Sequence, residues 1–180
     1  MRNQGKTYKL MLTALFIALG LVLPLLTAQV PQIGSMLLPM HIPVLICGFV
    51  CGWQYGLVAG LVTPLLRSMT FGMPPLFPVA TAMAFEMAAY GAVCGWLYKM
   101  RKKNAASVYI SLLGAMIAGR VVWGLVNIPI YGIAGKAYSW QIFITGALIN
   151  AVPGIVLQIV LIPLIILALE RAHVMEMGAE

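Results

Sequence analysis

The stretch from Leu37 to Leu66 contains no Asp, Glu, Lys or Arg, and this feature limits the possible fold more than any other. As one continuous helix it would be about 45 Å long, since an α-helix rises about 1.5 Å per residue. The hydrocarbon core of a bilayer is only about 30 Å thick. A break is therefore expected, and segment 52–56, which begins and ends with glycine, provides it. We predict two short apolar helices that span a thinned membrane or form a broken pair.

The composition extends this argument to the whole chain. Hydrophobic residues make up 62% of the 180 residues and charged residues only 8%, whereas about a quarter of a soluble domain is charged. The mean hydropathy is +1.00. We therefore expect residues 1–180 to form a single all-α domain in the cell membrane, in contact with lipid.

Six transmembrane helices are expected, joined by short loops. Their approximate ranges are 7–28, 39–52, 54–69, 76–98, 107–131 and 140–169. Pro24 is expected to kink the outer end of the first. The basic N-terminus followed by an apolar run is also typical of a signal peptide. The run from Leu10 to Ala28 is longer than the usual signal core of about 7–15 residues, so we interpret it as a membrane helix.

Most of the basic residues flank the apolar runs. They form three groups: Arg2, Lys6 and Lys9; Lys99, Arg101, Lys102 and Lys103; and Arg171. An even number of crossings, either six or four plus a re-entrant pair, places all three groups on one side. By the positive-inside rule this side is the cytoplasm, and both termini are predicted to lie there. Orientation explains the net charge of +7, which does not indicate a nucleic-acid partner.

Small residues recur four positions apart in several helices. Ala14 and Ala18 lie on one face of the first helix, where another helix could approach closely. From the spacing alone, packing inside the protein is an equal alternative. The glycine pairs 48/52, 56/60 and 91/95 have the same spacing, and most of them are expected to serve internal packing. The three cysteines lie in apolar segments, so we interpret them as core residues and expect neither a disulfide framework nor a metal site.

Two ionisable residues lie near the middle of predicted helices. Glu86 is about nine residues from the outer end of its helix, and Arg120 is about thirteen residues from the inner end of the next. Charges at this depth are costly and usually pair or serve function. We therefore expect these two side chains to be able to meet. They form either a structural ion pair or part of a site for a polar solute, and the two roles are compatible.

The helix that carries Arg120 extends this polar face. Trp123, Asn127 and Tyr131 follow it at spacings that place all four side chains in one stripe. A cation, an indole, an amide and a phenol make a poor lipid-facing surface. They suit a pocket wall with a few directed polar groups. Hydrogen bonding between helices is the structural alternative.

Three further residues complete the predicted substrate-binding set. They are Asn150 at similar depth on the last helix, Arg67 near the outer rim, and His41 at the start of the second helix, by the outer mouth. Arg67 could instead extend to the lipid headgroups, and His41 could be a satisfied boundary residue. Arg67, Arg120 and Glu86 sum to one positive charge, which favours an anionic or zwitterionic ligand.

Several kinds of chemistry have no sequence support. There is no Walker motif for ATP hydrolysis, no acidic cluster for a divalent metal, and no Ser/His or Cys/His arrangement at membrane depth. We expect a protein that is not an enzyme and has no cofactor. A weakly supported alternative is an intramembrane enzyme or assembly factor.

The helix count, Ala14 and Ala18, and the segment HIPVLICGFVCGWQYGLVAGLVTPLLRS resemble the S components of energy-coupling factor (ECF) transporters. The resemblance covers nearly the whole chain. It implies a membrane-embedded subunit that binds a vitamin or related micronutrient with high affinity for a bacterial or archaeal ABC importer. The implied partners are a transmembrane scaffold protein and two ATPases, with Ala14 and Ala18 on the docking face.

The resemblance also implies that the subunit topples in the membrane to carry its solute inward. It does not identify the pocket residues or the vitamin. The alternative is a stand-alone small carrier or channel. The absence of a clear inverted sequence repeat counts against that alternative.

Overall fold

Every regular element in the part of the chain that the structure describes is helical, as predicted. The computed structural model describes residues 5–27, 37–102, 104–133 and 151–172. The elements are α1 (Lys6–Val22), η1 (Leu23–Thr27), α3 (His41–Cys51), α4 (Trp53–Phe71), η2 (Leu76–Ala80), α5 (Thr81–Lys99), α6 (Ala105–Ile133) and α8 (Val152–Arg171).

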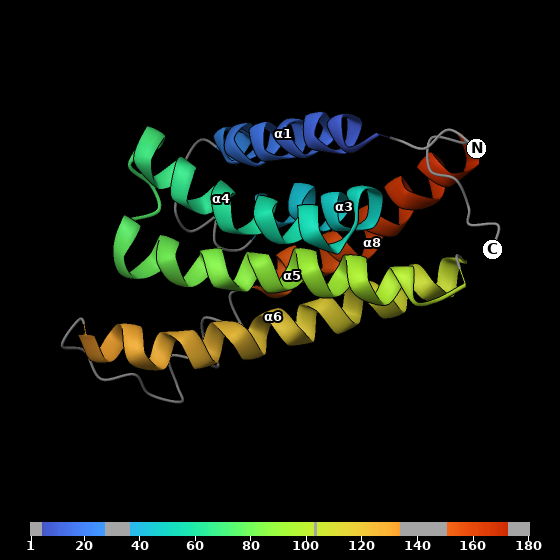
Figure 1. Cartoon of the computed structure of the whole chain (residues 1–180). Helices are drawn as coiled ribbons and strands as arrows, with labels where there is room; N and C mark the ends of the chain where they lie inside the picture. The colour runs from blue at the N-terminus through green and yellow to red at the C-terminus, as the bar shows by residue number, and fades with distance from the viewer. Residues whose placement is uncertain (1–4, 28–36, 103, 134–150, 173–180) are drawn as a thin grey trace.

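The break in the charge-free run occurs where the sequence predicted it. α3 ends at Cys51 and α4 begins at Trp53, with Gly52 between them at a φ of 100°. This left-handed conformation favours glycine, because a side chain would clash with the backbone. The chain therefore reverses at one residue, and α3 and α4 lie beside each other (Figure 1).

Prolines mark two further helix ends. The first predicted helix is α-helical only to Val22 and continues as a 3₁₀ turn that contains Pro24. In the last predicted helix, α8 starts at Val152, with Pro153 in its first turn. Residues 140–150, which we also assigned to this helix, lie outside the described residues.

Six full crossings are not confirmed. Four segments of the described residues are long and apolar enough to cross a membrane: Lys6–Leu25, Leu76–Lys99, Ala105–Ile133 and Val152–Arg171. α3 has 11 residues and is only about 16 Å long. It is too short for a bilayer core of about 30 Å, so α3 and α4 more closely match the predicted broken pair.

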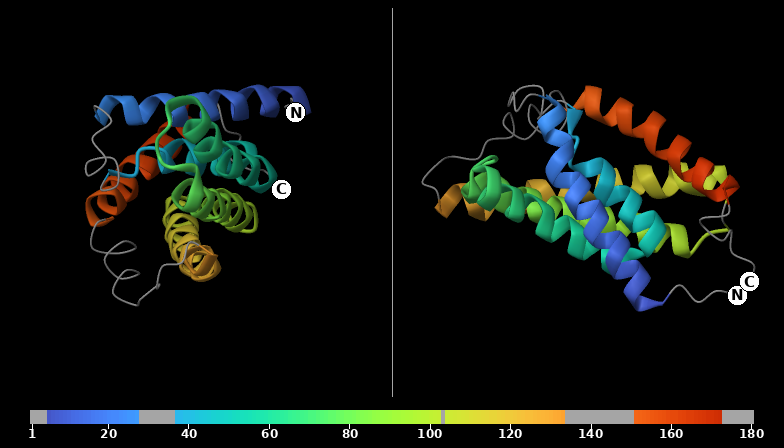
Figure 2. Two further views of the ribbon diagram at one scale, coloured as in Figure 1. Left: turned by 90° about the vertical axis from the view of Figure 1, so that its left-hand side faces the viewer. Right: turned by 90° about the horizontal axis from the view of Figure 1, so that it is seen from above.

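The helices pack around α5. α4 and α6 lie along two sides of α5, α3 fills the space beside α4 and α5, and α1 lies across α3 and α4 (Figures 1 and 2). α8 crosses the bundle and contacts α3 and α6 over a smaller part of its length. The beginning of α1, the α5–α6 connection and the end of α8 all lie at the right-hand end of Figure 1.

That common end is the basic end of the molecule. It holds Lys6, Lys9, Lys99, Arg101 and Lys102 on its elements, and Arg171 at the end of α8. The charge groups in the described residues therefore lie together, as an even number of crossings requires. The assignment of this end to the cytoplasm stays a prediction from the positive-inside rule.

Glycines bring α3, α4 and α5 into backbone contact. A Cβ atom on Gly91 would collide with the backbone of Gly56, and one on Gly95 would lie 2.6 Å from the carbonyl oxygen of Gly48. Gly60 faces the Met87 backbone in the same way. Internal packing is thus confirmed for these glycines, whereas Gly52 is a turn residue. We call this contact the glycine seam (Gly48, Gly56, Gly60, Gly91 and Gly95).

The glycine seam also fixes the depth of α3. The inner end of α3 lies beside Gly95, and its first residue, His41, lies beside Glu86. α3 therefore covers only the half of α5 nearer the basic end, as Figure 1 shows. Its N-terminus begins inside the bundle, where the predicted polar residues are found.

Candidate functional site

Glu86 on α5 and Arg120 on α6 form an ion pair, which confirms that these side chains can meet. The Arg120 Nη1 atom lies 2.8 Å from Glu86 Oε1, and the Glu86 side chain is only 3% exposed. Removing two charges from water costs free energy, and their mutual attraction offsets this cost only with good geometry and further hydrogen bonds. The surroundings of the pair therefore decide what it can do.

His41 lies next to this pair. Its Nε2 atom is 3.9 Å from Glu86 Oε2, and its ring meets the edge of Tyr90 at a centroid distance of 5.2 Å. The sequence placed His41 at the outer mouth. The structure instead buries it, with 1% exposed, because the short α3 begins halfway along the bundle. His41, Glu86 and Arg120 are called the central polar cluster below.

The central polar cluster has unused hydrogen-bonding atoms. Within the described part of the chain, both ring nitrogens of His41 and the Nε and Nη2 atoms of Arg120 are buried and make no hydrogen bond. An unsatisfied buried donor or acceptor usually costs about 1–3 kcal/mol. Native proteins keep few such groups, and those present often indicate a ligand or water site. This cluster is therefore the strongest candidate for a solute site.

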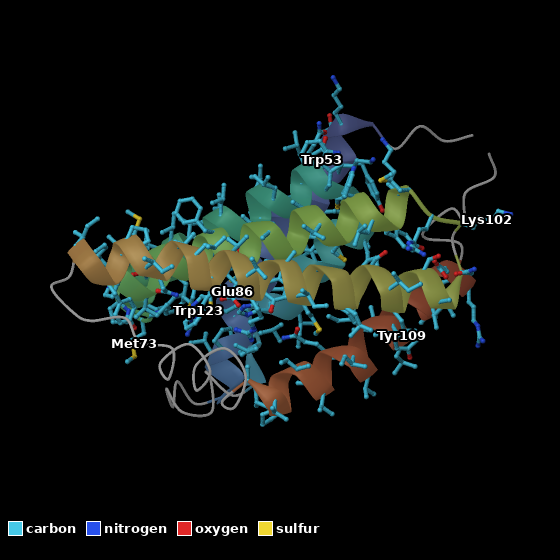
Figure 3. All side chains as sticks on the ribbon, turned by 90° about the horizontal axis from the view of Figure 1, so that it is seen from below. Trp53, Met73, Glu86, Lys102, Tyr109 and Trp123 are labelled. Carbon is cyan, nitrogen blue, oxygen red and sulfur yellow. The ribbon has the colours of Figure 1, made fainter. Side chains whose placement is uncertain are left out.

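The predicted stripe on α6 does face the interior. Asn127 is buried, Trp123 and Tyr131 are half-buried, and the intervening Val121 and Leu125 are exposed. Figure 3 shows Trp123 in the same part of the bundle as Glu86. The Asn127 Nδ2 atom donates to the Trp123 carbonyl at 2.8 Å within α6, so one of its two amide N–H groups is already used locally.

Arg67 lies apart from the central polar cluster. It is 4% exposed, its Nη1 donates to the carbonyl oxygen of Leu21 near the end of α1, and its guanidinium lies 5.1 Å from the Phe71 ring centroid. The alternative of a side chain extended to the headgroups does not fit this burial. The contact joins α4 to α1. Asn150, the last predicted residue, lies outside the described residues.

Gln158 is a candidate site residue that was not predicted from the sequence. Its side chain is 1% exposed on α8, and its Nε2 has no hydrogen-bond partner in the described part of the chain. It projects from the α8 face whose Ile155 and Ile162 pack into the core shared with α3 and α5. A signal was present, because Gln158 is the sole amide in the apolar run from Val152 to Leu169.

Along its own helix, Gln158 lies as far from the basic end as Glu86 does along α5. The hydroxyl of Tyr98 on α5 donates to Glu170 on α8, which aligns the two helices at the basic end. Glu86 and Gln158 each lie 12 positions before these partners (98 − 86 and 170 − 158). Both side chains are therefore about 18 Å along their helices from this contact.

Ala14 and Ala18 are both exposed on α1. The opposite face of α1 packs inward: the Thr13 hydroxyl is within 3.8 Å of Cys47 Sγ, and Gly20 lies against Thr63. The two alanines thus do not serve packing within the described part of this chain. Their role as a docking face stays a prediction.

Comparison of the sequence with known protein families gave a match. The family model described as ECF transporter, substrate-specific component, matches residues 8–166. The comparisons with curated proteins and with solved structures gave no match. The family match covers most of the chain, including every residue of the central polar cluster. Together with this match, the four long apolar helices among the described residues make the protein a multi-pass membrane protein. The chain belongs to the family of substrate-specific components of ECF transporters.

Proposed function

We propose that this chain binds a vitamin-like micronutrient with high affinity at the central polar cluster and delivers it for ATP-driven import. In this proposal a transmembrane scaffold subunit and two ATPase subunits supply the energy, and the chain itself catalyses no reaction. The membrane is the plasma membrane of a bacterium or archaeon. The observation that carries the proposal is the buried ion pair with unpaired nitrogen atoms beside it, in a family of substrate-specific subunits.

The energetics of the cluster support binding rather than a purely structural role. A structural ion pair is stabilised by further hydrogen bonds to its remaining donors and acceptors. Arg120 uses one nitrogen for Glu86, while its other two make no hydrogen bond to the described residues. A polar solute that supplied the missing acceptors would remove this penalty. Binding would then gain free energy that the empty protein lacks.

Aromatic and amide groups near the cluster suit a small heteroaromatic or amide-containing solute. Trp123 offers an indole surface one turn from Arg120, and Gln158 offers an unpaired amide nitrogen on the inward face of α8. Pockets for small molecules commonly combine such apolar surface with a few directed polar groups. These residues, with Asn127, form the proposed wall of the site.

The exposed alanines of α1 support docking on a partner. A face of small residues allows helices to approach closely, and the contact can be reversible because no large side chains interlock. In the proposal, Ala14 and Ala18 contact the scaffold subunit. The bulky exposed residues beside them, including Leu15 and Leu19, then face lipid or the border of the contact.

Tryptophan substitutions test docking separately from binding. Ala14→Trp and Ala18→Trp should abolish uptake in cells that contain the partner subunits, because the indole blocks close approach. Binding of the co-purified solute should stay within about twofold of wild type, since both positions face away from the cluster. Leu125→Trp is the matched control on the exposed face of α6 and should keep uptake.

Reconstitution of the purified chain into liposomes tests the alternative of a stand-alone carrier or channel. Liposomes that contain this chain alone should show no uptake. Accumulation of solute without any ATPase would contradict the proposal and favour a stand-alone carrier or channel. Normal uptake by both tryptophan variants would contradict the docking face alone.

A further inference from the structure

We infer that the solute carries a carboxylate, which binds side-on to the free edge of the Arg120 guanidinium. This inference rests on the proposed function and goes beyond it by assigning a chemical class and one binding group. The three guanidinium nitrogens of Arg120 have different surroundings. Nη1 is committed to Glu86, while Nε and Nη2 are both unpaired in the described part of the chain.

The two free nitrogens are a matched pair. Nε and Nη2 lie on the same edge of the planar guanidinium, and their N–H bonds point in parallel directions. A carboxylate presents two oxygens at the spacing that accepts both bonds at once. This bidentate geometry is the reason why arginine is favoured over lysine for carboxylates. A single carbonyl or hydroxyl would leave one nitrogen unsatisfied.

Glu86 holds the free edge in position. Its contact with Nη1 fixes one side of the guanidinium, and the Nε2 atom of His41 lies 3.9 Å from the other carboxylate oxygen. Arg120 is therefore oriented before any solute arrives. Preorganised donors bind more tightly because less conformational freedom is lost on binding. In this assignment Glu86 is a positioning residue.

The start of α3 adds positive potential at the same place. A helix N-terminus carries roughly half a positive charge from its aligned peptide dipoles. α3 has no acidic residue in its first turn, and its first residue lies against Glu86. Broken membrane helices that end inside a protein commonly direct this end toward anionic groups of a solute. The dipole therefore helps to offset the repulsion between the carboxylate of the solute and that of Glu86.

Matched acid and neutral compounds test the assignment. The probes are nicotinate and nicotinamide, biotin and biotinamide, and pantothenate and pantothenol. Each is titrated into the purified full-length protein, with thermal unfolding and calorimetry as measurements. Small molecules released from the denatured protein are identified by mass spectrometry in parallel. We expect a released compound with a carboxylate, and at least one acid that binds tenfold or more tightly than its neutral partner.

Variants test whether the free edge of the Arg120 guanidinium causes the preference for acids. Arg120→Lys keeps the charge but loses the bidentate geometry, and should weaken acid binding at least tenfold. Glu86→Gln should keep or strengthen acid binding and enlarge the thermal shift that the acid causes, which a purely structural ion pair would not do. The double variant Glu86→Gln/Arg120→Gln carries no unpaired buried charge, so it should fold and bind acid and neutral partners alike. Arg171→Gln, an exposed arginine at the basic end, should behave as wild type.

Three results would overturn the inference and leave the proposed function intact: a released compound without an acid group, a neutral probe that binds as tightly as its acid, or acid preference that survives in the double variant. In each case the protein still binds a small molecule. If the protein releases no compound and none of the six probes binds, both the inference and the proposed function fail.

Discussion

The contact between Tyr98 and Glu170 shows how single side chains stabilise this bundle. Both residues are buried near the basic end, and the tyrosine hydroxyl donates to the carboxylate across 72 positions of sequence. Arg67 acts similarly near the other end, where it donates to a carbonyl of α1. Contacts of this kind stabilise a membrane bundle because lipid offers no hydrogen-bond partner to a buried polar group.

Tyr98→Phe should therefore lower the stability of the protein. The substitution leaves the buried Glu170 carboxyl without its donor, which costs roughly 1–3 kcal/mol. Thermal unfolding of the purified protein measures the loss. Tyr109→Phe makes the same chemical change at an exposed position on α6 and should alter stability by less than about 0.5 kcal/mol. Equal unfolding temperatures for both variants would show that the Glu170 contact contributes nothing.

The sequence predicts some of the site residues better than others, and depth explains the difference. Glu86 and Arg120 were identifiable because charges deep in apolar helices are rare and their distances from the helix ends can be counted. His41 was misplaced because the same count assumed that its helix starts at the membrane surface. Gln158 was overlooked because an uncharged amide stands out less than an ion. The alignment of α8 with α5 by Tyr98 and Glu170 is a long-range contact that spacing does not reveal.

The elements themselves were more predictable than single contacts. The lengths of the hydrophobic runs predicted the helices, and the segment 52–56 predicted the break between α3 and α4. Chain length alone could not show that α3 has 11 residues and begins inside the bundle. That depth depends on the glycine seam, which determines how α3 and α4 lie against α5.

Gly91→Ala should disrupt the seam. The added methyl group would meet the Gly56 backbone, which cannot rotate away as a side chain could. Overpacking of this kind typically costs about 1–3 kcal/mol, so the unfolding temperature should fall. Gly132→Ala, near the end of α6, has open space around the new methyl group. It should be neutral or slightly stabilising, because alanine favours helix by up to about 1 kcal/mol. A stable Gly91→Ala variant would mean that the three backbones are not in contact.

At the scale of the whole molecule, the arrangement of charge and polar groups defines two ends. The basic residues gather at one end, the central polar cluster lies at mid-depth, and the α4–α5 connection lies at the other end (Figure 1). The positive-inside rule assigns the basic end to the cytoplasm. A solute captured from outside would then enter from the end that holds the α4–α5 connection.

Cysteine labelling tests this orientation. Met73→Cys places a thiol in the α4–α5 connection, and Arg101→Cys places one in the α5–α6 connection; both positions are exposed. A membrane-impermeant maleimide should label the first variant in intact cells and the second only after lysis. The three native cysteines are buried and free, so the unmodified chain serves as the background control. Labelling of Arg101→Cys in intact cells would reverse the assigned orientation.

The glycine seam has a mechanical consequence. Where backbones touch, no layer of side chains lies between the helices to be compressed or repacked, so α3, α4 and α5 behave as one stiff unit. Deformation that admits a solute is then confined to the borders of that unit. Among the described α-helices, α8 is the least closely packed against its neighbours, and it carries Gln158 on its inward face. A solute that binds beside Gln158 would therefore displace α8 more readily than α3, α4 or α5.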